Sequence, residues 1–267
     1  MSRLFVYSNR LPLGSNPSGG LVVALGKTMD RQGGVWVGAK LDETLCDNQK
    51  LHEYKGAAFE RHALHLPPRE YNDYYLGYAN SVLWPLFHGR TDLLDVADGQ
   101  LDAYTSVNRK MAEATRHLLK PDDVIWIHDY HFIPLAAELR ALGVSNPIGF
   151  FLHTPFPSSG NVHALTHKDR LLDWLSAYDL VGLQTQRDVS ALIEVCRTVF
   201  GGQMLSDGRI RCKGQDIRAA SFPIGIDVKK FRAIAETCDT SALNIDPQQK
   251  LLIGVDRLDY SKGLPHK

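Results

Sequence analysis

Three polar side chains that can exchange protons or bind ligands follow two short apolar runs of the sequence. His128 and Asp129 come directly after residues 124–127, and His153 comes directly after residues 148–152. Side chains of these types could ligate a metal ion or act in acid–base catalysis. No further ligand follows at a spacing typical of a metal site, whereas a carboxylate can accept hydrogen bonds from two sugar hydroxyl groups. We therefore favour a hydroxyl-binding cluster over a metal site.

A glycine-rich turn joins the first apolar run, residues 4–7, to a helical pattern that begins at Leu21. The turn starts near Arg10 and ends with Gly19 and Gly20. Glycine allows close approach of the backbone, and a helix N-terminus offers free N–H groups and partial positive charge. With the full charge of Arg10, the turn predicts a phosphate or sugar site. An ordinary surface loop is the alternative.

The tripeptide Gly26-Lys27-Thr28 looks like the end of a P-loop, G-x-x-x-x-G-K-[ST]. Leu21 stands where that motif requires its first glycine, and residues 21–25 form an apolar helical segment. The sequence also lacks a G-x-G-x-x-G motif. These departures exclude a P-loop nucleotide triphosphatase.

Aromatic residues gather between Tyr74 and His88, among them Tyr75 and Trp84, where helical periodicity is weak. Aromatic rings often line sugar sites because the C–H faces of sugars pack on them. They fill hydrophobic cores more often, so the sequence leaves both interpretations of this segment open.

Short β-type runs alternate with amphipathic helical patterns along the chain. Apolar stripes at spacings of three and four predict helices at residues 101–118, 134–143 and 189–200. Thr185, followed three residues later by Asp188, predicts the N-cap of the last helix. This alternation predicts an α/β fold with a parallel sheet and helices on both faces. The strands are expected at residues 4–7, 124–127, 148–152, 180–183 and 251–255.

The carboxyl ends of those strands carry most of the residues singled out above. In open parallel sheets, ligands bind at the carboxyl ends of the strands. We therefore expect the strand ends at Asn9-Arg10, His128-Asp129 and His153 to converge on one rim of the sheet with the loop that holds Gly19 and Gly20.

The composition is that of a globular protein. The chain has 267 residues, 44% hydrophobic and 22% charged, with 30 basic and 30 acidic side chains. Zero net charge excludes a protein that binds nucleic acid or an acidic membrane through a broad electrostatic attraction. No apolar run reaches the roughly 20 residues that a membrane-spanning helix needs. The first residues lack the pattern of a secretory signal. Four widely spaced cysteines predict reduced thiols in a cytoplasmic protein, namely Cys46, Cys196, Cys212 and Cys238.

A polar stretch at residues 235–250 is typical of an inter-domain linker. We therefore expect one Rossmann-like domain over residues 1–247. Residues 248–267 hold an apolar run and a charged loop with Gly263, which is how a second Rossmann-like domain begins. The sequence predicts that this second domain is only begun, so we expect the chain to be incomplete.

Taken together, these segments resemble the trehalose-6-phosphate synthase family of OtsA-type retaining glucosyltransferases. The matching segments occur in the family's order, and each is too long for a chance match. They are residues 8–10, 18–21, 82–88, 122–131, 148–157, 222–227 and 255–265. The resemblance implies the GT-B architecture, in which two Rossmann-like domains face each other across a cleft. Residues 1–247 would then be the acceptor-side domain, and residues 248–267 the start of the donor-binding domain.

The resemblance also implies roles on the acceptor side. Arg10 would hold the phosphate of glucose 6-phosphate, with Tyr75 and Asp129 on the same acceptor. Trp84 and His153 would shape the glucose pocket. His153 and Asp129 would be the catalytic candidates.

On the donor side, the resemblance implies that UDP-glucose contacts the backbone N–H groups of Gly19 and Gly20. Arg257 and Lys262 would meet its diphosphate and stabilise the charge that grows there, with no bound metal and no cofactor. The acceptor hydroxyl would attack from the face that the diphosphate leaves, which retains the configuration. The products would be trehalose 6-phosphate and UDP.

Two other functions remain open at this point. One is a sister enzyme with another acceptor, such as a glucosylglycerol-phosphate synthase. The other is a non-enzymatic fragment that binds sugar phosphate. We expect the full-length protein to be a homo-oligomer, and residues 1–267 alone not to turn over UDP-glucose.

Overall fold

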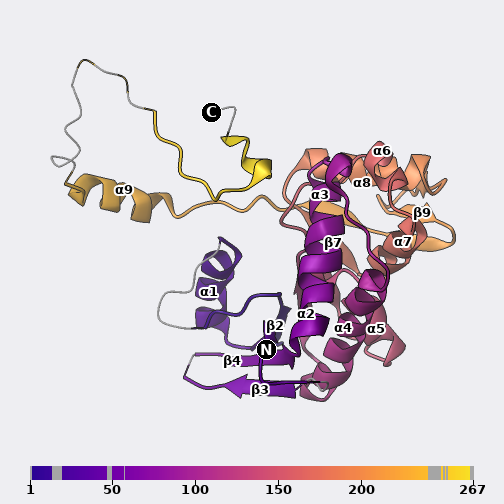
Figure 1. Cartoon of the computed structure of the whole chain (residues 1–267), viewed down its shortest axis with the longest axis horizontal. Coiled ribbons are helices and arrows are strands. Elements are labelled where there is room, and N and C mark those ends of the chain that lie inside the picture. The colour runs from indigo at the N-terminus through magenta and orange to yellow at the C-terminus, as the bar shows by residue number, and fades with distance from the viewer. Residues whose placement is uncertain are drawn as a thin grey trace. The chain divides into compact units, whose positions relative to one another are not determined.

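The computed structural model describes residues 2–13, 20–46, 50–56, 58–239, 248, 250 and 252–264. The chain forms two compact units, Met1–Pro223 and Ile224–Lys267 (Figure 1). The larger unit carries a mixed α/β architecture, and the smaller one contains helix α9 (Val228–Thr237) and the short helix η6 (Tyr260–Lys262). The domain limits at residues 247 and 248 stay a prediction.

An eight-stranded sheet forms the centre of the larger unit, with the strand order β11-β7-β6-β5-β1-β2-β4-β3. Each neighbouring pair is parallel except β3 with β4. The strands are β1 (Leu4–Tyr7), β2 (Val35–Leu41), β3 (Lys50–Tyr54), β4 (Glu60–Leu66), β5 (Val124–His128), β6 (Ile148–Phe151), β7 (Leu180–Leu183) and β11 (Ala219–Ser221). A small antiparallel sheet is formed by β8 (Gln203–Met204), β9 (Ile210–Cys212) and β10 (Gln215–Ile217).

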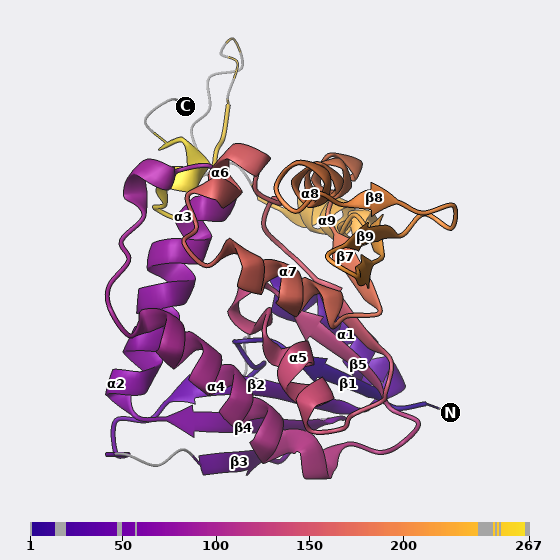
Figure 2. The same ribbon diagram turned by 90° about the vertical axis from the view of Figure 1, so that its right-hand side faces the viewer.

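Helices cover both faces of the large sheet, as the α/β prediction requires. Side chains alternate along β1, so Phe5 and Tyr7 join the large core while Val6 packs in a second cluster with Met29 of α1. Figure 2 shows α4, α5 and α7 lying across one face of the sheet. The helices are α1 (Gly20–Gln32), α2 (Pro68–Tyr71), η1 (Asn72–Leu83), α3 (Trp84–Phe87), η2 (Thr91–Leu93), α4 (Gln100–Thr115), η3 (Arg116–Leu118), η4 (Tyr130–Phe132), α5 (Leu135–Ala141), α6 (Ser159–His163), α7 (Lys168–Ser176) and α8 (Gln186–Thr198).

The segment where helical periodicity is weak is a π-helix, η1, followed directly by α3. A π-helix has a wider turn than an α-helix, so apolar residues do not recur at the α-helical spacing. The P-loop look-alike at residues 26–28 lies inside α1, as its apolar neighbours suggest. Both observations agree with the sequence.

The capping prediction for α8 is confirmed. Thr185 Oγ1 accepts from the backbone N–H of Asp188 at 3.2 Å, and the Asp188 carboxylate accepts from the backbone N–H of Thr185 at 3.1 Å. The second Asp188 oxygen accepts from the backbone N–H of Phe156 at 3.1 Å. The cap therefore also fixes the loop that follows β6.

The prediction of a strand at residues 251–255 is wrong for residues 252–255, which form no strand. Leu251 lies outside the described residues. A β-strand needs a hydrogen-bonded neighbour, and no strand in the described part of the chain pairs with this segment. Leu252 and Val255 are 95% and 89% exposed, so apolar character alone did not create a strand.

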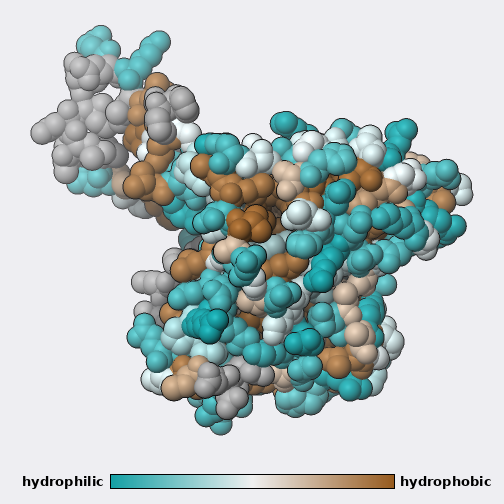
Figure 3. Space-filling view, turned by 45° about the vertical axis from the view of Figure 1, so that its right-hand side comes forward, coloured by the Kyte–Doolittle hydropathy of each residue, from teal (hydrophilic) through white to brown (hydrophobic). Residues whose placement is uncertain are grey.

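The surface of the larger unit mixes polar residues with scattered apolar patches (Figure 3). Within the described residues, none of the helices combines the length and the apolar character needed to span a membrane. All four cysteines are free, with Cys196 and Cys212 buried and Cys46 and Cys238 exposed.

Candidate functional site

The strand order brings three strand ends to one rim of the sheet. β1 lies beside β5, and β5 lies beside β6, all parallel and in register, with Tyr7 opposite Ile127 and His128 opposite Phe151. The residues that follow these strands therefore leave the sheet on the same side. This arrangement places Arg10, Asp129 and His153 on one rim, as expected from the sequence.

Arg10 lies at this rim with an exposed side chain. Interaction with the Tyr75 side chain raises the pKa of Arg10, and Tyr71 and Tyr130 act in the same direction. The Tyr75 ring stacks on His131, with centroids 5.5 Å apart and planes 14° apart. The guanidinium is thus held against aromatic side chains at the place where a phosphate could reach it.

Hydrogen bonds on both sides fix the turn that carries Arg10. The buried Trp36 Nε1–H donates to Ser8 Oγ at 2.8 Å, and Ser8 Oγ donates to the carbonyl of Arg10 at 2.7 Å. On the other side, the Tyr74 hydroxyl donates to Asn9 Oδ1 at 3.0 Å. Strand β2, through Trp36, and helix η1, through Tyr74, therefore hold this turn in place.

Helix η1 supplies several of the aromatic residues around the rim. Tyr74 points into the core and is fully buried, whereas its neighbour Tyr75 is half-buried beside Arg10. Near the end of η1, Asn80 Oδ1 accepts from the Tyr130 hydroxyl at 2.9 Å. Trp84 follows directly after η1, and its ring centroid lies 5.7 Å from that of Tyr130.

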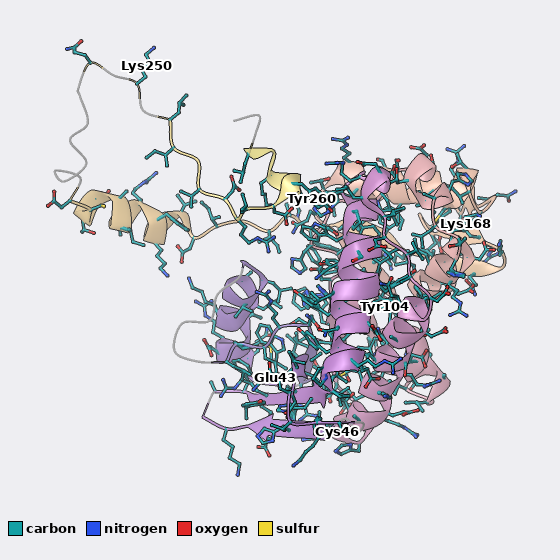
Figure 4. The ribbon with its side chains drawn as sticks, in the orientation of Figure 1. Glu43, Cys46, Tyr104, Lys168, Lys250 and Tyr260 are labelled. Atoms are coloured by element: carbon teal, nitrogen blue, oxygen red, sulfur yellow. The ribbon has the colours of Figure 1, made fainter. Side chains whose placement is uncertain are left out.

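A second layer of aromatic residues supports these rings. Tyr104 of α4, labelled in Figure 4, stacks on Tyr74 with centroids 6.0 Å apart. Its hydroxyl donates to the carbonyl of Tyr130. Tyr74 thus fills the core, whereas Tyr75 and Trp84 are half-buried beside His131 and Tyr130, and their role in a sugar site stays a prediction.

Asp129 adopts a backbone conformation that residues with a side chain rarely adopt, with φ of 69°. Such strain is concentrated at functional sites. Burial raises the pKa of Asp129 to about 6, although hydrogen bonds from the backbone N–H groups of Tyr130 and His153 oppose the shift. The second of these bonds joins His153 N to Asp129 Oδ1 at 3.3 Å. Above its pKa, this carboxylate can accept hydrogen bonds from a ligand.

The two histidines at the rim are paired through their rings. His128 Nδ1 and His153 Nε2 lie 3.0 Å apart, a hydrogen-bond distance. Burial lowers the pKa of His153 to about 4, and burial together with His153 lowers the pKa of His128 well below 6.5. Both imidazoles are therefore neutral at physiological pH.

His131 is buried between Tyr75 and Tyr130, and its centroid lies 4.1 Å from the Tyr130 ring. Burial, with a smaller contribution from Arg10, lowers the pKa of His131 to about 3. Neither ring nitrogen has a hydrogen-bond partner among the described residues. His131 is thus a neutral, aromatic support for Tyr75.

The donor-side residues named from the sequence fall outside what the geometry of this rim can test. Gly19 lies outside the described residues, and Gly20 begins α1. Arg257 and Lys262 belong to the smaller unit. Their proposed contacts with a donor stay a prediction.

Two contributors to the rim were given no role of their own from the sequence: Ser8 and Tyr130. Ser8 stands two residues before Arg10, and Tyr130 directly follows Asp129. Proximity to a predicted site residue was therefore an available signal. Among the described residues, no group of three or more His, Cys, Asp or Glu side chains is placed to hold a metal ion.

Comparison with known proteins matches residues 11–267 to a family model described as "Glycosyltransferase family 20". The chain belongs to glycosyltransferase family 20. Among curated members of related sequence, the trehalose-6-phosphate synthase of Sodalis glossinidius is 41% identical over 278 residues, and that of Sinorhizobium fredii is 38% identical. All of this chain is covered in both cases, but only 58% and 60% of the relatives. The chain thus spans less than two thirds of their length.

Solved structures of family 20 enzymes share the fold. An α,α-trehalose-phosphate synthase (UDP-forming) from Burkholderia xenovorans, in complex with glucose-6-phosphate, superimposes with a TM-score of 0.81 at 35% identity, covering 88% of this chain and 52% of that one. An Escherichia coli structure bound with UDP-2-fluoro glucose has a TM-score of 0.81 at 37% identity, covering 91% and 53%. The predicted GT-B-type, Rossmann-like fold class is confirmed by this likeness.

Proposed function

We propose that this chain carries the acceptor side of an α,α-trehalose-phosphate synthase that transfers glucose from UDP-glucose to glucose 6-phosphate with retention. The observation that carries the proposal is the Arg10 guanidinium, which interacts with Tyr75 on the same rim as Asp129 and His153. A fixed guanidinium suits a phosphate monoester because it can donate two parallel hydrogen bonds. The Burkholderia xenovorans relative with glucose-6-phosphate supports this choice of acceptor.

On the acceptor side, each residue of the rim has a distinct role in this proposal. Arg10 and Tyr75 bind the phosphate, and the Asp129 carboxylate accepts a hydrogen bond from a sugar hydroxyl group. Trp84 offers a ring face to the sugar, and the neutral His153 imidazole can donate to or accept from a sugar oxygen. Together these groups orient the acceptor hydroxyl for attack.

In the transfer step, the anomeric hydroxyl oxygen of glucose 6-phosphate forms a bond with C1 of the donor glucose. The bond from C1 to the diphosphate breaks on the same face, and the hydroxyl proton passes to the departing phosphate oxygen. UDP and trehalose 6-phosphate result. Gly19, Gly20, Arg257 and Lys262 would bind the donor and stabilise the departing charge, in keeping with the UDP-2-fluoro glucose bound to the Escherichia coli relative.

Several broader properties belong to the same proposal. Neither nucleic acid nor a membrane is expected as a partner, since acidic and basic residues balance at 30 each. We propose a cytoplasmic enzyme that needs no cofactor and whose full-length form is a homo-oligomer. Light scattering of the full-length protein tests the oligomeric state.

Calorimetric titration of this chain with glucose 6-phosphate and with glucose tests the acceptor proposal. Wild type should prefer glucose 6-phosphate, and Arg10→Ala should abolish that preference, because a charge-assisted hydrogen bond to a phosphate contributes roughly 2–4 kcal/mol. Arg69→Ala is the matched control, since its side chain is 96% exposed. Equal binding of both sugars by wild type would contradict the proposal. Tighter binding of glycerol 3-phosphate would favour the sister enzyme instead.

A further inference from the structure

The hydrogen bond between the rings of His128 and His153 can be formed in two ways. Either His128 Nδ1–H donates to His153 Nε2, or His153 Nε2–H donates to His128 Nδ1, across the same 3.0 Å. A neutral imidazole carries one proton, so the nitrogen that donates fixes the tautomer of its ring. The surroundings of the other two ring nitrogens distinguish the two arrangements.

The surroundings of His128 favour a proton on Nδ1. His128 is 1% exposed, and its Nε2 atom is buried without a hydrogen-bond partner among the described residues. The rings of Trp126 and Phe151 pack around it, with centroids 4.4 and 6.2 Å away. A proton on Nε2 would leave a buried N–H donor unsatisfied, which proteins tolerate less well than a bare acceptor. The proton therefore belongs on His128 Nδ1, which donates to His153.

The opposite tautomer follows for His153. Its Nε2 accepts the bond from His128, so the proton of the neutral ring is on Nδ1. No hydrogen bond to this Nδ1 is formed within the described residues, and the ring is half-buried at the rim. The backbone of His153 is held as well, because its N–H donates to Asp129 Oδ1 at 3.3 Å. The adjacent residues His128, at the end of β5, and Asp129 thus fix the ring and the backbone of His153 respectively.

We propose that His128 is a positioning residue that holds His153 in the Nδ1–H tautomer, so that His153 presents a hydrogen-bond donor to a sugar oxygen at the rim. His128 itself is too deeply buried to touch a ligand. The sugar as the partner rests on the proposed function, whereas the tautomer follows from the protein's own contacts. The two parts can therefore be tested separately.

Nuclear magnetic resonance of the chain with ¹⁵N-labelled histidine tests the tautomer directly, since protonated and bare ring nitrogens differ widely in chemical shift. In wild type near neutral pH, His153 should carry its proton on Nδ1. His128→Asn places an amide N–H near the position of Nδ1 and should preserve that tautomer. His128→Leu has a similar size but no donor, and it should shift His153 towards the Nε2–H form.

A wild-type His153 protonated on Nε2 would overturn the proposal, and so would an unchanged tautomer in His128→Leu. The exposed His163 offers a control, because His163→Asn should leave the His153 signals unaltered. If thermal unfolding shows that His128→Leu does not fold, the wild-type spectrum and His128→Asn still decide the question.

Addition of glucose 6-phosphate then separates this inference from the proposed function. The His153 Nδ1 signal of wild type should shift, and affinity should fall about tenfold in His128→Leu but little in His128→Asn. His153 in the Nδ1–H form with no response to glucose 6-phosphate would uphold the tautomer and contradict the acceptor site. If the His153 signals shift with glucose 6-phosphate but the ring is protonated on Nε2, the acceptor site is upheld and the proposed tautomer is contradicted.

Discussion

Tyr74 donates a hydrogen bond to Asn9 Oδ1 at 3.0 Å, which joins helix η1 to the residue before Arg10. Both side chains are buried, with Tyr74 at 0% and Asn9 at 5% exposed. The two residues are 65 positions apart in sequence, so this bond depends on the packing of η1 against the sheet. It therefore connects the stability of the fold to the position of the Arg10 turn.

Tyr74→Phe should lower the free energy of unfolding by about 1–3 kcal/mol, because it leaves Asn9 Oδ1 buried without that donor. Glucose 6-phosphate binding should weaken as well, since Arg10 follows Asn9. Urea unfolding and calorimetric titration measure the two effects. The matched control is Tyr78→Phe, because Tyr78 is also buried on η1 but its hydroxyl has no partner among the described residues. Equal destabilisation by both variants would contradict this role for Tyr74.

Gly38 allows the Arg10 turn to pack against β2. A Cβ atom at this position would lie 2.8 Å from Leu11 Cγ and 2.9 Å from the carbonyl oxygen of Ser8, closer than Cβ atoms are found in proteins. Gly38→Ala should therefore displace the turn and destabilise the protein by about 1–3 kcal/mol.

Gly26→Ala is the control for that substitution, because Gly26 lies inside α1 and a Cβ there meets no atom within 4 Å. It should stabilise the helix by about 0.5–1 kcal/mol. Urea unfolding of both variants gives the comparison. A Gly38→Ala protein as stable as wild type would show that the turn can adapt without loss.

Arg3, whose side chain is 19% exposed, forms an ion pair with a buried carboxylate and joins the start of β1 to the segment before β5. Arg3 Nε and Nη2 donate to the two Asp123 oxygens at 3.1 and 2.9 Å, and Asp123 is 1% exposed. Arg3→Ala would leave this carboxylate without its guanidinium, so we expect a loss of about 3–5 kcal/mol.

Arg209 provides the contrast, because its side chain is 43% exposed and it pairs with Asp207 at 2.7 Å and with Asp216 at 2.9 Å. Arg209→Ala should change stability by less than about 1 kcal/mol, since water screens exposed pairs. Thermal or urea unfolding measures the stability of the Arg3→Ala and Arg209→Ala variants. Similar losses in the two variants would mean that burial does not set the strength of the Arg3 pair.

Local sequence patterns predicted the elements on which the rim is built. The observed strands Val124–His128 and Ile148–Phe151 differ by one residue from the predicted ones, and Leu180–Leu183 agrees. These strands are short, apolar and bounded by polar residues. Because the carboxyl ends of parallel strands share one rim, the place of Arg10, Asp129 and His153 after their strands was enough to predict that they share that rim.

Features that depend on distant partners were not predictable in this way. β3 (Lys50–Tyr54) is a largely exposed edge strand without an apolar pattern, and it exists because it pairs with β4. The His128–His153 bond joins rings 25 residues apart, and it requires β5 and β6 to be neighbours in one register. The apolar run at residues 252–255 shows the converse, since no partner strand forms beside it in the described structure.

Acidification should destabilise the protein through its buried histidines. Burial lowers the pKa of His131 from 6.5 to about 3. Between these two pH values, His131 therefore binds a proton in the unfolded chain but not in the folded protein. Stability attributable to His131 is therefore complete above pH 6.5 and falls as the pH drops towards 3. At about pH 5 the loss is on the order of 2 kcal/mol. Burial raises the pKa of Asp129 to about 6, which acts in the opposite direction in the same range.

His131→Phe isolates the histidine contribution, because Asp129 and the other groups titrate alike in wild type and variant. Phe keeps an aromatic ring between Tyr75 and Tyr130 and removes two ring nitrogens that have no partner among the described residues. The variant should gain stability over wild type, and the gain should grow by about 2 kcal/mol between about pH 7.5 and pH 5. Urea unfolding at both pH values measures it, with the exposed His163→Asn as the control whose pH dependence should match wild type. Parallel pH profiles for His131→Phe and wild type would show that His131 takes up its proton equally in both states, and that the ring is not shielded from water in the folded protein.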